Sequence, residues 1–377
     1  ATRPGQPTSM DVWSAAIGVL LLLEATRRVL GLPMVVVAIV FLIYTFAGPH
    51  MPDMLAHRGA SLDRAASHFW LTTEGVFGVA LGVSSGFIFL FVLFGSLLDK
   101  AGAGNYFIKS AFALLGHMRG GPAKAAVVSS AATGIISGSS IANVVTTGTF
   151  TIPLMKRVGY RGDQAGAVEV SSSVNGQIMP PVMGAAAFLM VEYVGIPYVQ
   201  VMKHAFLPAI ISYIALFYIV HLEALKAGMQ GLPRRTQSTG SQRLLSFLMT
   251  VTGFIVLAGI TYYAIGFIKS IFGAAAVPVI GVGLLVAYVG LLWVSSRQPE
   301  LEIDDPNAPV FELPETGPTV RSGLHYLLAV VVLVWCLMVE QLSPALSAFW
   351  ATMFMVFVML TQKPILGVMR GDNRPLD

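Results

Sequence analysis

The sequence predicts an all-α polytopic membrane protein that contains a re-entrant helical hairpin and one broken helix. Hydrophobic residues make up 55% of the 377 residues, charged residues only 11%, and the mean hydropathy is +0.74. A soluble domain carries about 25% charged residues. Several apolar runs approach the roughly 20 residues that a helix needs to cross a bilayer. Two polar interruptions lie inside this apolar sequence, and hydrocarbon tolerates such backbone only where it faces protein or a solvated cavity.

Nine apolar runs predict membrane-spanning segments, of which the second and eighth are short. They cover residues 11–29, 32–46, 76–98, 163–194, 199–221, 244–267, 274–294, 324–338 and 344–360. Two other segments, 61–70 and 105–117, carry charged residues on one side of an apolar helix, a pattern typical of a helix in the membrane interface. The one cysteine, Cys336, allows neither an internal disulfide nor a thiolate metal cluster.

The first polar interruption is residues 127–153, VVSSAATGIISGSSIANVVTTGTFTIP, in which eleven of the 23 residues from 129–151 are Ser, Thr or Asn. Its two arms, 122–137 and 141–157, have 16 and 17 residues. They would form helices of about 24 to 26 Å, each short for a hydrocarbon core of roughly 30 Å. We therefore predict a hairpin that enters and leaves the membrane on one side, with a Gly-Ser-Ser tip. Two ordinary short helices joined by a polar turn are the alternative.

The distribution of Lys and Arg favours the hairpin. When Arg27 and Arg28 are placed in the cytoplasm and the hairpin returns to its own side, 18 of the 23 Lys and Arg residues are cytoplasmic. A single crossing by 127–153 would move five arginines between Arg234 and Arg321 outside, against the positive-inside rule. The basic residues are dispersed over loops, so topology explains the net charge of +4 better than nucleic acid does. The five external ones are Arg3, Arg58, Arg64, Lys203 and Lys269.

The second polar interruption, residues 171–181 (SSSVNGQIMPP), divides another long apolar run. Pro180 and Pro181 prevent a continuous helix, because both lack a backbone donor. We expect exposed carbonyls near 173–175, a second half-helix that starts near Pro180, and free N–H groups near 182–183. Half-helix N-termini attract carboxylates and C-terminal carbonyls attract a small cation, so the two interruptions together predict a transport site.

Glu169 lies about one turn before this break. An acid inside a spanning helix is costly and commonly functional, which makes Glu169 a candidate coupling acid. A buried partner for a Lys or Ser is the alternative.

Five stretches of the sequence carry the pattern of a known family. They are LEATRRVLG ending at Gly31, LTTEGVFGVALGVSS (71–85), FLFVLFGSLLDKAGAG (89–104), RGGPAKAAVVSSAATGIISGSSIANVVTTGTFTIPLMKRVGY (119–160) and AGAVEVSSSVNGQIMPPVMGAAAFLM (165–190). With them the chain resembles the large, DctM-like permease subunit of tripartite ATP-independent periplasmic (TRAP) transporters, specifically the fused permeases of the TAXI subgroup. The resemblance is nearly continuous over 22–232 and looser beyond it.

The resemblance implies a permease of the bacterial inner membrane that takes small organic acids from a periplasmic TAXI-type binding protein. It implies import by an elevator mechanism, driven by a Na+ or H+ gradient and without a further cofactor or metal. The substrate- and ion-binding residues carried over are Ser137, Gly138, Ser139, Ser140 and Asn143 at the hairpin tip, and Ser172, Ser173, Asn175, Gly176, Gln177, Pro180 and Pro181 at the break.

The resemblance also divides the chain into segments. These are N-terminal membrane helices (1–70), a scaffold helix with an interfacial arm helix (71–118), a transport repeat (119–232), an extra helix pair (243–296), an acidic cytoplasmic linker (297–322) and the start of a second repeat (323–377). The repeat contains the hairpin at 122–157 and the broken helix at 163–194. A second hairpin and a second broken helix do not follow in the sequence, so remaining permease segments are an expected partner.

Two other function classes compete with a transporter. An intramembrane enzyme is disfavoured, because 127–153 contains no His, Asp, Glu or Cys for acid–base or nucleophilic chemistry. A channel-like or non-transporting membrane subunit stays as the alternative.

Overall fold

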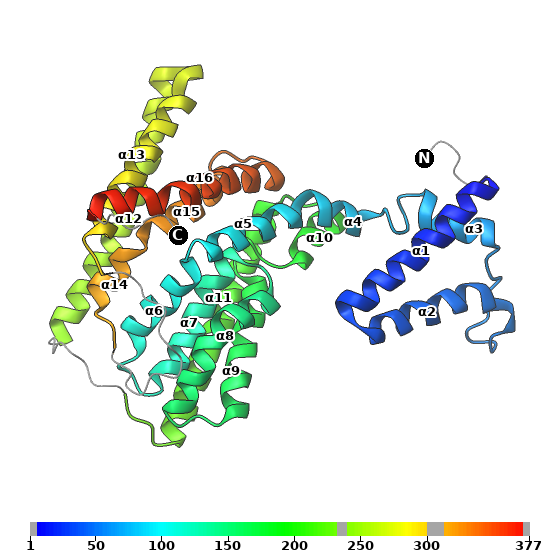
Figure 1. Ribbon diagram of the computed structural model, residues 1–377, viewed down its shortest axis with the longest axis horizontal. Helices are drawn as coiled ribbons and strands as arrows, with labels where there is room; N and C mark the ends of the chain where they lie inside the picture. Colours follow the sequence, from blue (N-terminus) through cyan, green and yellow to red (C-terminus); the bar gives the residue numbers. More distant parts are fainter. Residues whose placement is uncertain (1–5, 232–239, 300–312, 372–377) are drawn as a thin grey trace. The chain divides into compact units, whose positions relative to one another are not determined.

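The computed structural model describes residues 6–231, 240–299 and 313–371, and the regular secondary structure of these residues is helical throughout. The chain forms two compact units, which are coloured along the sequence in Figure 1. The first consists of Ala1–Ile88 and Phe188–Gly195, and the second of Phe89–Ala187 and Ile196–Asp377. Helix α10 (Ala185–Val194) crosses the boundary between them.

The first unit contains two long helices and several short ones. They are α1 (Ser9–Leu30), α2 (Leu32–Ala47), a 3₁₀ turn (Gly48–His50), α3 (Leu62–Ala66), a π-helix (Ser67–Leu71), α4 (Val79–Val83) and a second π-helix (Ser84–Ile88). Thr8 starts α1 with a capping box, because its hydroxyl accepts from the Asp11 N–H and the Asp11 carboxylate accepts from the Thr8 N–H. Gly31 joins α1 to α2 with a φ of 85°, which glycine adopts without strain. The ring of Trp70 covers Gly18 of α1, so that a larger residue at Gly18 would overlap it.

The second unit contains the two segments that were singled out from the sequence. Its helices are α5 (Phe89–Lys100), α6 (Ala103–Leu115), α7 (Gly121–Ile136), α8 (Ser140–Arg157), α9 (Gly162–Asn175), a 3₁₀ turn (Gly176–Ile178), α11 (Tyr198–Lys226), α12 (Gly240–Phe272), a 3₁₀ turn (Gly273–Ala275), α13 (Ala276–Ser296), α14 (Thr316–Ser322), α15 (Leu324–Met338) and α16 (Pro344–Arg370). Helices α7, α8, α9 and α11 lie side by side as a bundle (Figure 1). Helix α6 packs along α7, while α16 packs against α5, α13 and α15.

Small residues allow the bundle helices to approach one another closely. Ala123 and Ala126 of α7, Ala165 of α9 and Ala224 of α11 are fully buried in one apolar cluster, which Met155 of α8 completes. Close approach of small side chains is how helices associate in a membrane, where no hydrophobic force drives them together. The same packing holds the two arms of the predicted hairpin against α9 and α11.

Among the residues that the structure describes, six helices are long and apolar enough to cross a membrane. They are Ser9–Leu30, Leu32–His50, Val79–Lys100, Tyr198–Lys226, Ala276–Ser296 and Pro344–Arg370. The pair α14 and α15, bent by 52°, is a seventh candidate. Between 11% and 33% of the most apolar 18-residue stretch of each helix is buried within the protein, for example 17% in α11. The exposed apolar faces suit contact with lipid, and the predicted fold class, an all-α polytopic membrane protein, is confirmed.

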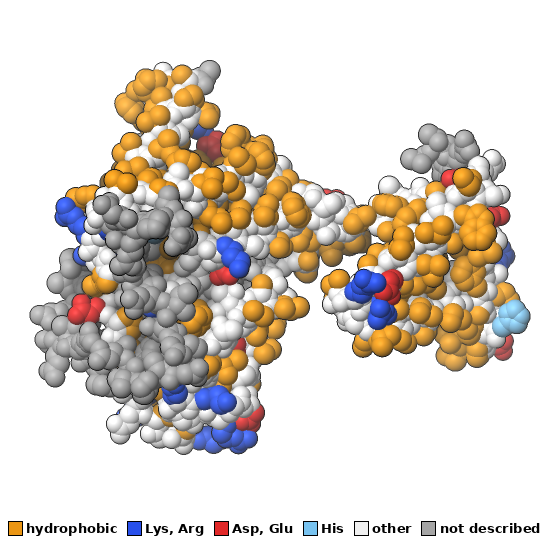
Figure 2. Space-filling view, viewed as in Figure 1, with side chains coloured by type: hydrophobic (Ala, Val, Ile, Leu, Met, Phe, Trp, Pro, Cys, Tyr) orange, Lys and Arg blue, Asp and Glu red, His pale blue; other side chains and the backbone are white. Residues whose placement is uncertain are grey.

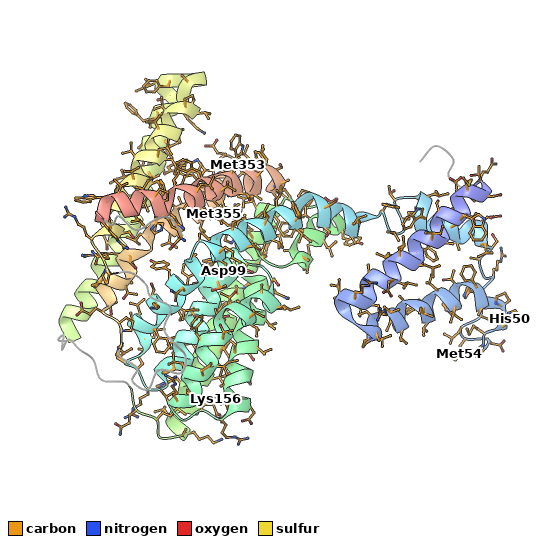
Figure 3. The ribbon with its side chains drawn as sticks, in the orientation of Figure 1. His50, Met54, Asp99, Lys156, Met353 and Met355 are labelled. Carbon is orange, nitrogen blue, oxygen red and sulfur yellow. The ribbon has the colours of Figure 1, made fainter. Side chains whose placement is uncertain are left out.

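Basic side chains gather at the base of the helical hairpin, away from its tip. Lys156 and Arg157 end α8, and Arg161 precedes α9 and pairs with Asp163 at 2.6 Å. Figure 2 shows Lys and Arg side chains at the lower end of the bundle, where Figure 3 labels Lys156. Such charges cannot enter hydrocarbon at low cost. The base of the hairpin therefore faces water or lipid headgroups.

Two of the predicted segments pack against helices that the local pattern does not indicate. The predicted interfacial helix, 105–117, is present as α6, but it is covered by α7 and α14 and buries Tyr106, Phe107 and Phe112. The predicted linker, 297–322, ends in α14, whose first residue, Thr316, donates from its hydroxyl to the α6 carbonyl of Ala113 at 3.0 Å. Residues 300–312 of that linker lie outside the described residues. The contact between α6 and α14 joins residues 203 positions apart, and the local pattern does not contain it.

Candidate functional site

The hairpin tip is a three-residue connection between α7 and α8. Helix α7 ends at Ile136, and Ser137, Gly138 and Ser139 lead into α8 at Ser140. The Ser139 hydroxyl accepts a hydrogen bond from the N–H of Ala142 at 3.2 Å and so caps α8. The predicted position of the turn is therefore confirmed, and its serines are half-buried rather than packed in a dry core.

The break in the second element runs from Asn175, the last residue of α9, to Ala185, the first residue of α10. We expected α10 to begin near Pro180 with a free N–H at Met183, and this was wrong. Met183 has a φ of 53°, outside the helical region, and its N–H donates to the carbonyl of Met179 at 3.3 Å. The second half-helix therefore starts only after Gly184.

Two tyrosines of α11 hold the break in place. The hydroxyl of Tyr198 lies 2.8 Å from the carbonyl oxygens of both Pro181 and Val182. The hydroxyl of Tyr213 donates to the carbonyl of Ser172 at 3.0 Å. A break in a membrane helix leaves backbone carbonyls without helical partners, and buried phenols satisfy three of them here.

The hairpin tip and the break meet directly. The side-chain amide of Gln177 donates to the Ser140 hydroxyl at 2.8 Å. Gly138 lies so close to the Met183 carbonyl and the Gly184 amide that a Cβ atom at position 138 would overlap the backbone. Residues that are 37 positions apart in the sequence thus form one polar surface.

The same contacts bring like ends of the helices together. A Cβ added at Gly134, near the end of α7, would lie 2.7 Å from the Cα of Gly176, which follows α9. The carbonyl-rich C-terminal ends of α7 and α9 are therefore neighbours. On the other side of the crossing, Gly138 precedes the N-terminus of α8 and lies beside Gly184, which precedes that of α10. The arrangement presents two positive helix ends and two negative helix ends within one site.

Glu169 is fully buried beside this crossing, between α8 and α9. One carboxyl oxygen bonds the hydroxyls of Thr147 and, at 3.4 Å, Ser173, and the other bonds the hydroxyl of Thr151. Hydroxyl groups from two helices therefore satisfy both oxygens, which a buried carboxyl group requires. In the part of the chain that the structure describes, Glu169 bonds serine and threonine hydroxyls, and its role as a coupling acid stays a prediction.

A second set of polar contacts joins all three helices next to Glu169. The Asn143 amide donates to the carbonyl of Ser130 at 3.0 Å, and the hydroxyls of Ser130 and Ser173 lie 3.3 Å apart. Asn143 and Ser173 are buried. They connect the two hairpin arms to α9 and lie behind the polar surface at the tip.

The twelve predicted site residues thus separate into a front group and a back group. The half-buried or exposed front group is Ser137, Gly138, Ser139, Ser140, Asn175, Gln177 and Pro180, and the buried back group is Asn143, Ser172, Ser173, Gly176 and Pro181. The Ser172 hydroxyl bonds carbonyls of its own helix, those of Val168 and Glu169. Only the front group can touch a ligand without rearrangement of the helices.

The sequence analysis did not assign roles to Thr147, Thr151, Ser130 or the two tyrosines. One signal was present for α8, because Asn143, Thr147 and Thr151 repeat every four residues and share one helix face. The tyrosines carry no such signal, since they come from a separate helix. Figure 3 labels a further acid, Asp99 of α5, whose carboxylate accepts from the Thr146 hydroxyl of α8 at 3.5 Å.

The sequence of this chain is similar to those of several known proteins. A sequence model described as "Tripartite ATP-independent periplasmic transporter, DctM component" matches residues 17–362. The chain is 26% identical over 171 residues to the sialic acid TRAP transporter large permease protein SiaM of Vibrio cholerae, which covers 45% of this chain and 40% of that protein. It is 34% identical over 91 residues to the C4-dicarboxylate TRAP transporter large permease protein DctM of Rhodobacter capsulatus (24% and 21%). It is 30% identical over 95 residues to the ectoine TRAP transporter large permease protein TeaC of Halomonas elongata (25% and 22%). Each alignment covers less than half of the relative's own length.

Proposed function

The chain belongs to the DctM component family of tripartite ATP-independent periplasmic transporters, and from this membership we propose that it is the permease part of a secondary transporter importing small organic acids. The family consists of transporter permease subunits and not of enzymes, in agreement with the lack of catalytic groups in the hairpin. The chain is a multi-pass membrane protein, and we propose the bacterial inner membrane as its location.

The observation that carries this proposal is the direct contact between the hairpin tip and the helix break. A bound carboxylate would face the N-terminal ends of α8 and α10, whose N–H groups and dipoles favour negative charge. The Ser140 hydroxyl accepts the bond from Gln177, and its own proton is left to donate to an anion. The neighbouring C-terminal ends of α7 and α9 supply carbonyl oxygens for a small cation.

The substrate class follows from the same chemistry. The front group offers hydroxyl, amide and backbone N–H donors, and these recognise a carboxylate without a compensating buried charge. The similar permeases are named for sialic acid, C4-dicarboxylates and ectoine, all of which carry a carboxylate. We propose a small carboxylate as the substrate.

An ion gradient would drive import, and the two polar centres suggest different ions. Serine, asparagine and backbone oxygens suit Na+, a hard cation with oxygen ligands. Glu169, which is buried and hydrogen-bonded to three hydroxyl groups, would instead carry H+. In a Na+-driven carrier, Glu169→Gln keeps uptake dependent on Na+, because the amide can still bond the surrounding hydroxyls. In an H+-driven carrier, the same change abolishes the response to a pH gradient.

The remaining parts of the proposal rest on the family. We propose that a periplasmic substrate-binding protein of the TAXI type delivers the substrate and that further permease segments complete the site from the opposite side. The transport repeat would then move as an elevator, carrying the hairpin and the broken helix together. Their extensive polar contacts around Glu169 suit motion as one body.

The test is uptake of labelled carboxylates into proteoliposomes that contain the permease and its binding protein. Na+ and pH gradients are imposed separately, and the binding protein is omitted in a parallel reaction. Saturable uptake that collapses with one gradient and requires the binding protein supports the proposal. Non-saturable flux that persists without a gradient indicates a channel instead, and no flux under any condition indicates a non-transporting subunit.

A further inference from the structure

A cavity of about 440 Å³ lies outside the site described above, between the last turns of α12 and the end of α15. Tyr262, Tyr263 and Phe267 of α12 line it on one side, and Trp335 and Val339 line it on the other. Its volume falls within the range of about 300–1,000 Å³ that is usual for ligand pockets. Both helices that form it end here, so the cavity opens at the edge of the membrane-spanning region.

Two opposite charges meet at this cavity. The Lys269 ammonium lies 2.6 Å from both carboxylate oxygens of Glu340, and the Trp335 indole N–H donates to one of these oxygens at 2.9 Å. Burial raises the pKa of Glu340, but the hydrogen bonds from Lys269 and Trp335 outweigh it and hold the pKa below its usual value. The carboxylate is therefore negatively charged at neutral pH. The side chains are 42% and 27% exposed, so a ligand can reach both charges.

A partly exposed ion pair of this kind contributes little net stability, because solvent screens it. It can therefore exchange its internal partners for the charges of a ligand at low cost. A ligand that carries only a negative charge would take Lys269 and leave Glu340 without its cation. A ligand that carries both signs at a short separation satisfies both side chains at once.

Aromatic rings complete the site and indicate where it lies. The ring centroids of Tyr262 and Trp335 are 6.2 Å apart, and those of Tyr262 and Tyr263 are 5.6 Å apart. Tyrosine and tryptophan concentrate at the membrane–water interface, and their faces attract ammonium groups. Phe267, which lines the cavity, is 66% exposed, and Ile271, one turn further along α12, is 57% exposed, so the two offer an apolar surface to acyl chains.

We propose that this cavity binds the headgroup of a zwitterionic phospholipid with a primary ammonium group, such as phosphatidylethanolamine. The phosphate pairs with Lys269, and the ammonium donates to Glu340 among the aromatic rings. A choline headgroup lacks N–H donors for the carboxylate, and a glycerol headgroup lacks the positive charge. The site would anchor the extra helix pair, α12 and α13, to α15 at the membrane surface.

The experiment is native mass spectrometry of the purified permease in detergent, with phosphatidylethanolamine, phosphatidylcholine and phosphatidylglycerol added in equal amounts. We expect the wild type to retain phosphatidylethanolamine about fivefold over phosphatidylglycerol, the effect of one charge at a membrane surface. Lys269→Gln and Glu340→Gln should each remove this preference. The exchange of both charges, Lys269→Glu with Glu340→Lys, should keep it, because the site still presents both signs.

Two further variants separate binding from folding. Tyr263 is 77% exposed, so Tyr263→Ala should leave the fold intact and lower retention of phosphatidylethanolamine by removing one ring. Lys203→Gln on α11 is the matched control, an exposed lysine that does not line the cavity, and it should bind lipid as the wild type does. Equal retention of the three lipids by the wild type overturns the proposal. A preference for phosphatidylglycerol that Glu340→Gln strengthens also overturns it.

Discussion

Replacing Gly138 with alanine tests the contact on which the proposed site depends. A Cβ atom at this position would overlap the carbonyl oxygen of Met183 and lie 3.2 Å from the amide nitrogen of Gly184. Both are backbone atoms, and Tyr198 holds the adjoining carbonyls, so the break cannot yield as a flexible side chain would. Overpacking in such a place costs about 1–3 kcal/mol. The variant can relieve this cost only by separating the hairpin tip from the break.

This energetic cost shifts the equilibrium between molecules with the hairpin tip and the break in contact and molecules with the two separated. A penalty of about 1–3 kcal/mol lowers the ratio of molecules with the two elements in contact to molecules with them separated by about 5- to 150-fold. The initial rate of carboxylate uptake into proteoliposomes should fall with it. Gly166→Ala in α9 is the matched control, because nothing lies within 4 Å of an added Cβ there. Alanine should even stabilise that helix by about 1 kcal/mol. Equal uptake by the two variants would show that the contact is not needed for transport.

Four further substitutions test other parts of the bundle. Ser140→Ala and Asn175→Ala should each reduce uptake while membrane insertion, measured by cell fractionation, stays normal; unchanged transport in both would remove the site assignment. Tyr198→Phe takes the hydroxyl away from two carbonyls of the break and should lower the free energy of unfolding by about 0.5–1.5 kcal/mol, seen as a lower melting temperature, and an unchanged value would contradict the role given to this tyrosine. Burial and the charge of Glu223 raise the pKa of Tyr160, in the turn between α8 and α9, from 10 to about 12, so the folded protein holds the phenol proton more tightly than the unfolded chain does. Stability from this group is intact below pH 10 and is lost as the pH rises toward about 12, and Tyr160→Phe should flatten that part of a melting-temperature profile.

Local sequence was sufficient to locate the two interrupted elements. The tip around Gly138 was predictable because glycine and serine end one helix and cap the next, a rule that involves only neighbours in the chain. Pro180 and Pro181 likewise mark the break through their missing N–H groups. The restart of the helix was placed five residues too early. The N–H groups of Met183 and Gly184 bond the carbonyls of Met179 and Gln177, and these contacts hold the backbone out of the helix beyond the two prolines.

Buried polar partners could not be assigned in advance. Lys124 was counted among the cytoplasmic charges, yet it is 3% exposed, and its ammonium lies 3.0 Å from the Nδ1 atom of His221 on α11. Glu169 was identified as an intramembrane acid, but its three hydroxyl partners were not. Burial creates these pairings, because an unpaired polar group in a dry interior is too costly to keep, and the sequence does not say which groups burial will bring together.

The sequence alone determined that this protein is a helical membrane protein, where its helices are interrupted and which family it belongs to. The first two properties follow from composition, from the length of apolar runs and from glycine and proline acting on their immediate neighbours, and the family follows from the similarity of the sequence to known permeases. Only the tertiary structure decided that Ser140 meets Gln177, that Gly138 lies against the backbone of the break, and that two hydroxyls of α8 bond Glu169 of α9. Those contacts join residues 18 to 46 positions apart, and close packing of small side chains between helices, rather than any local preference, brings them together.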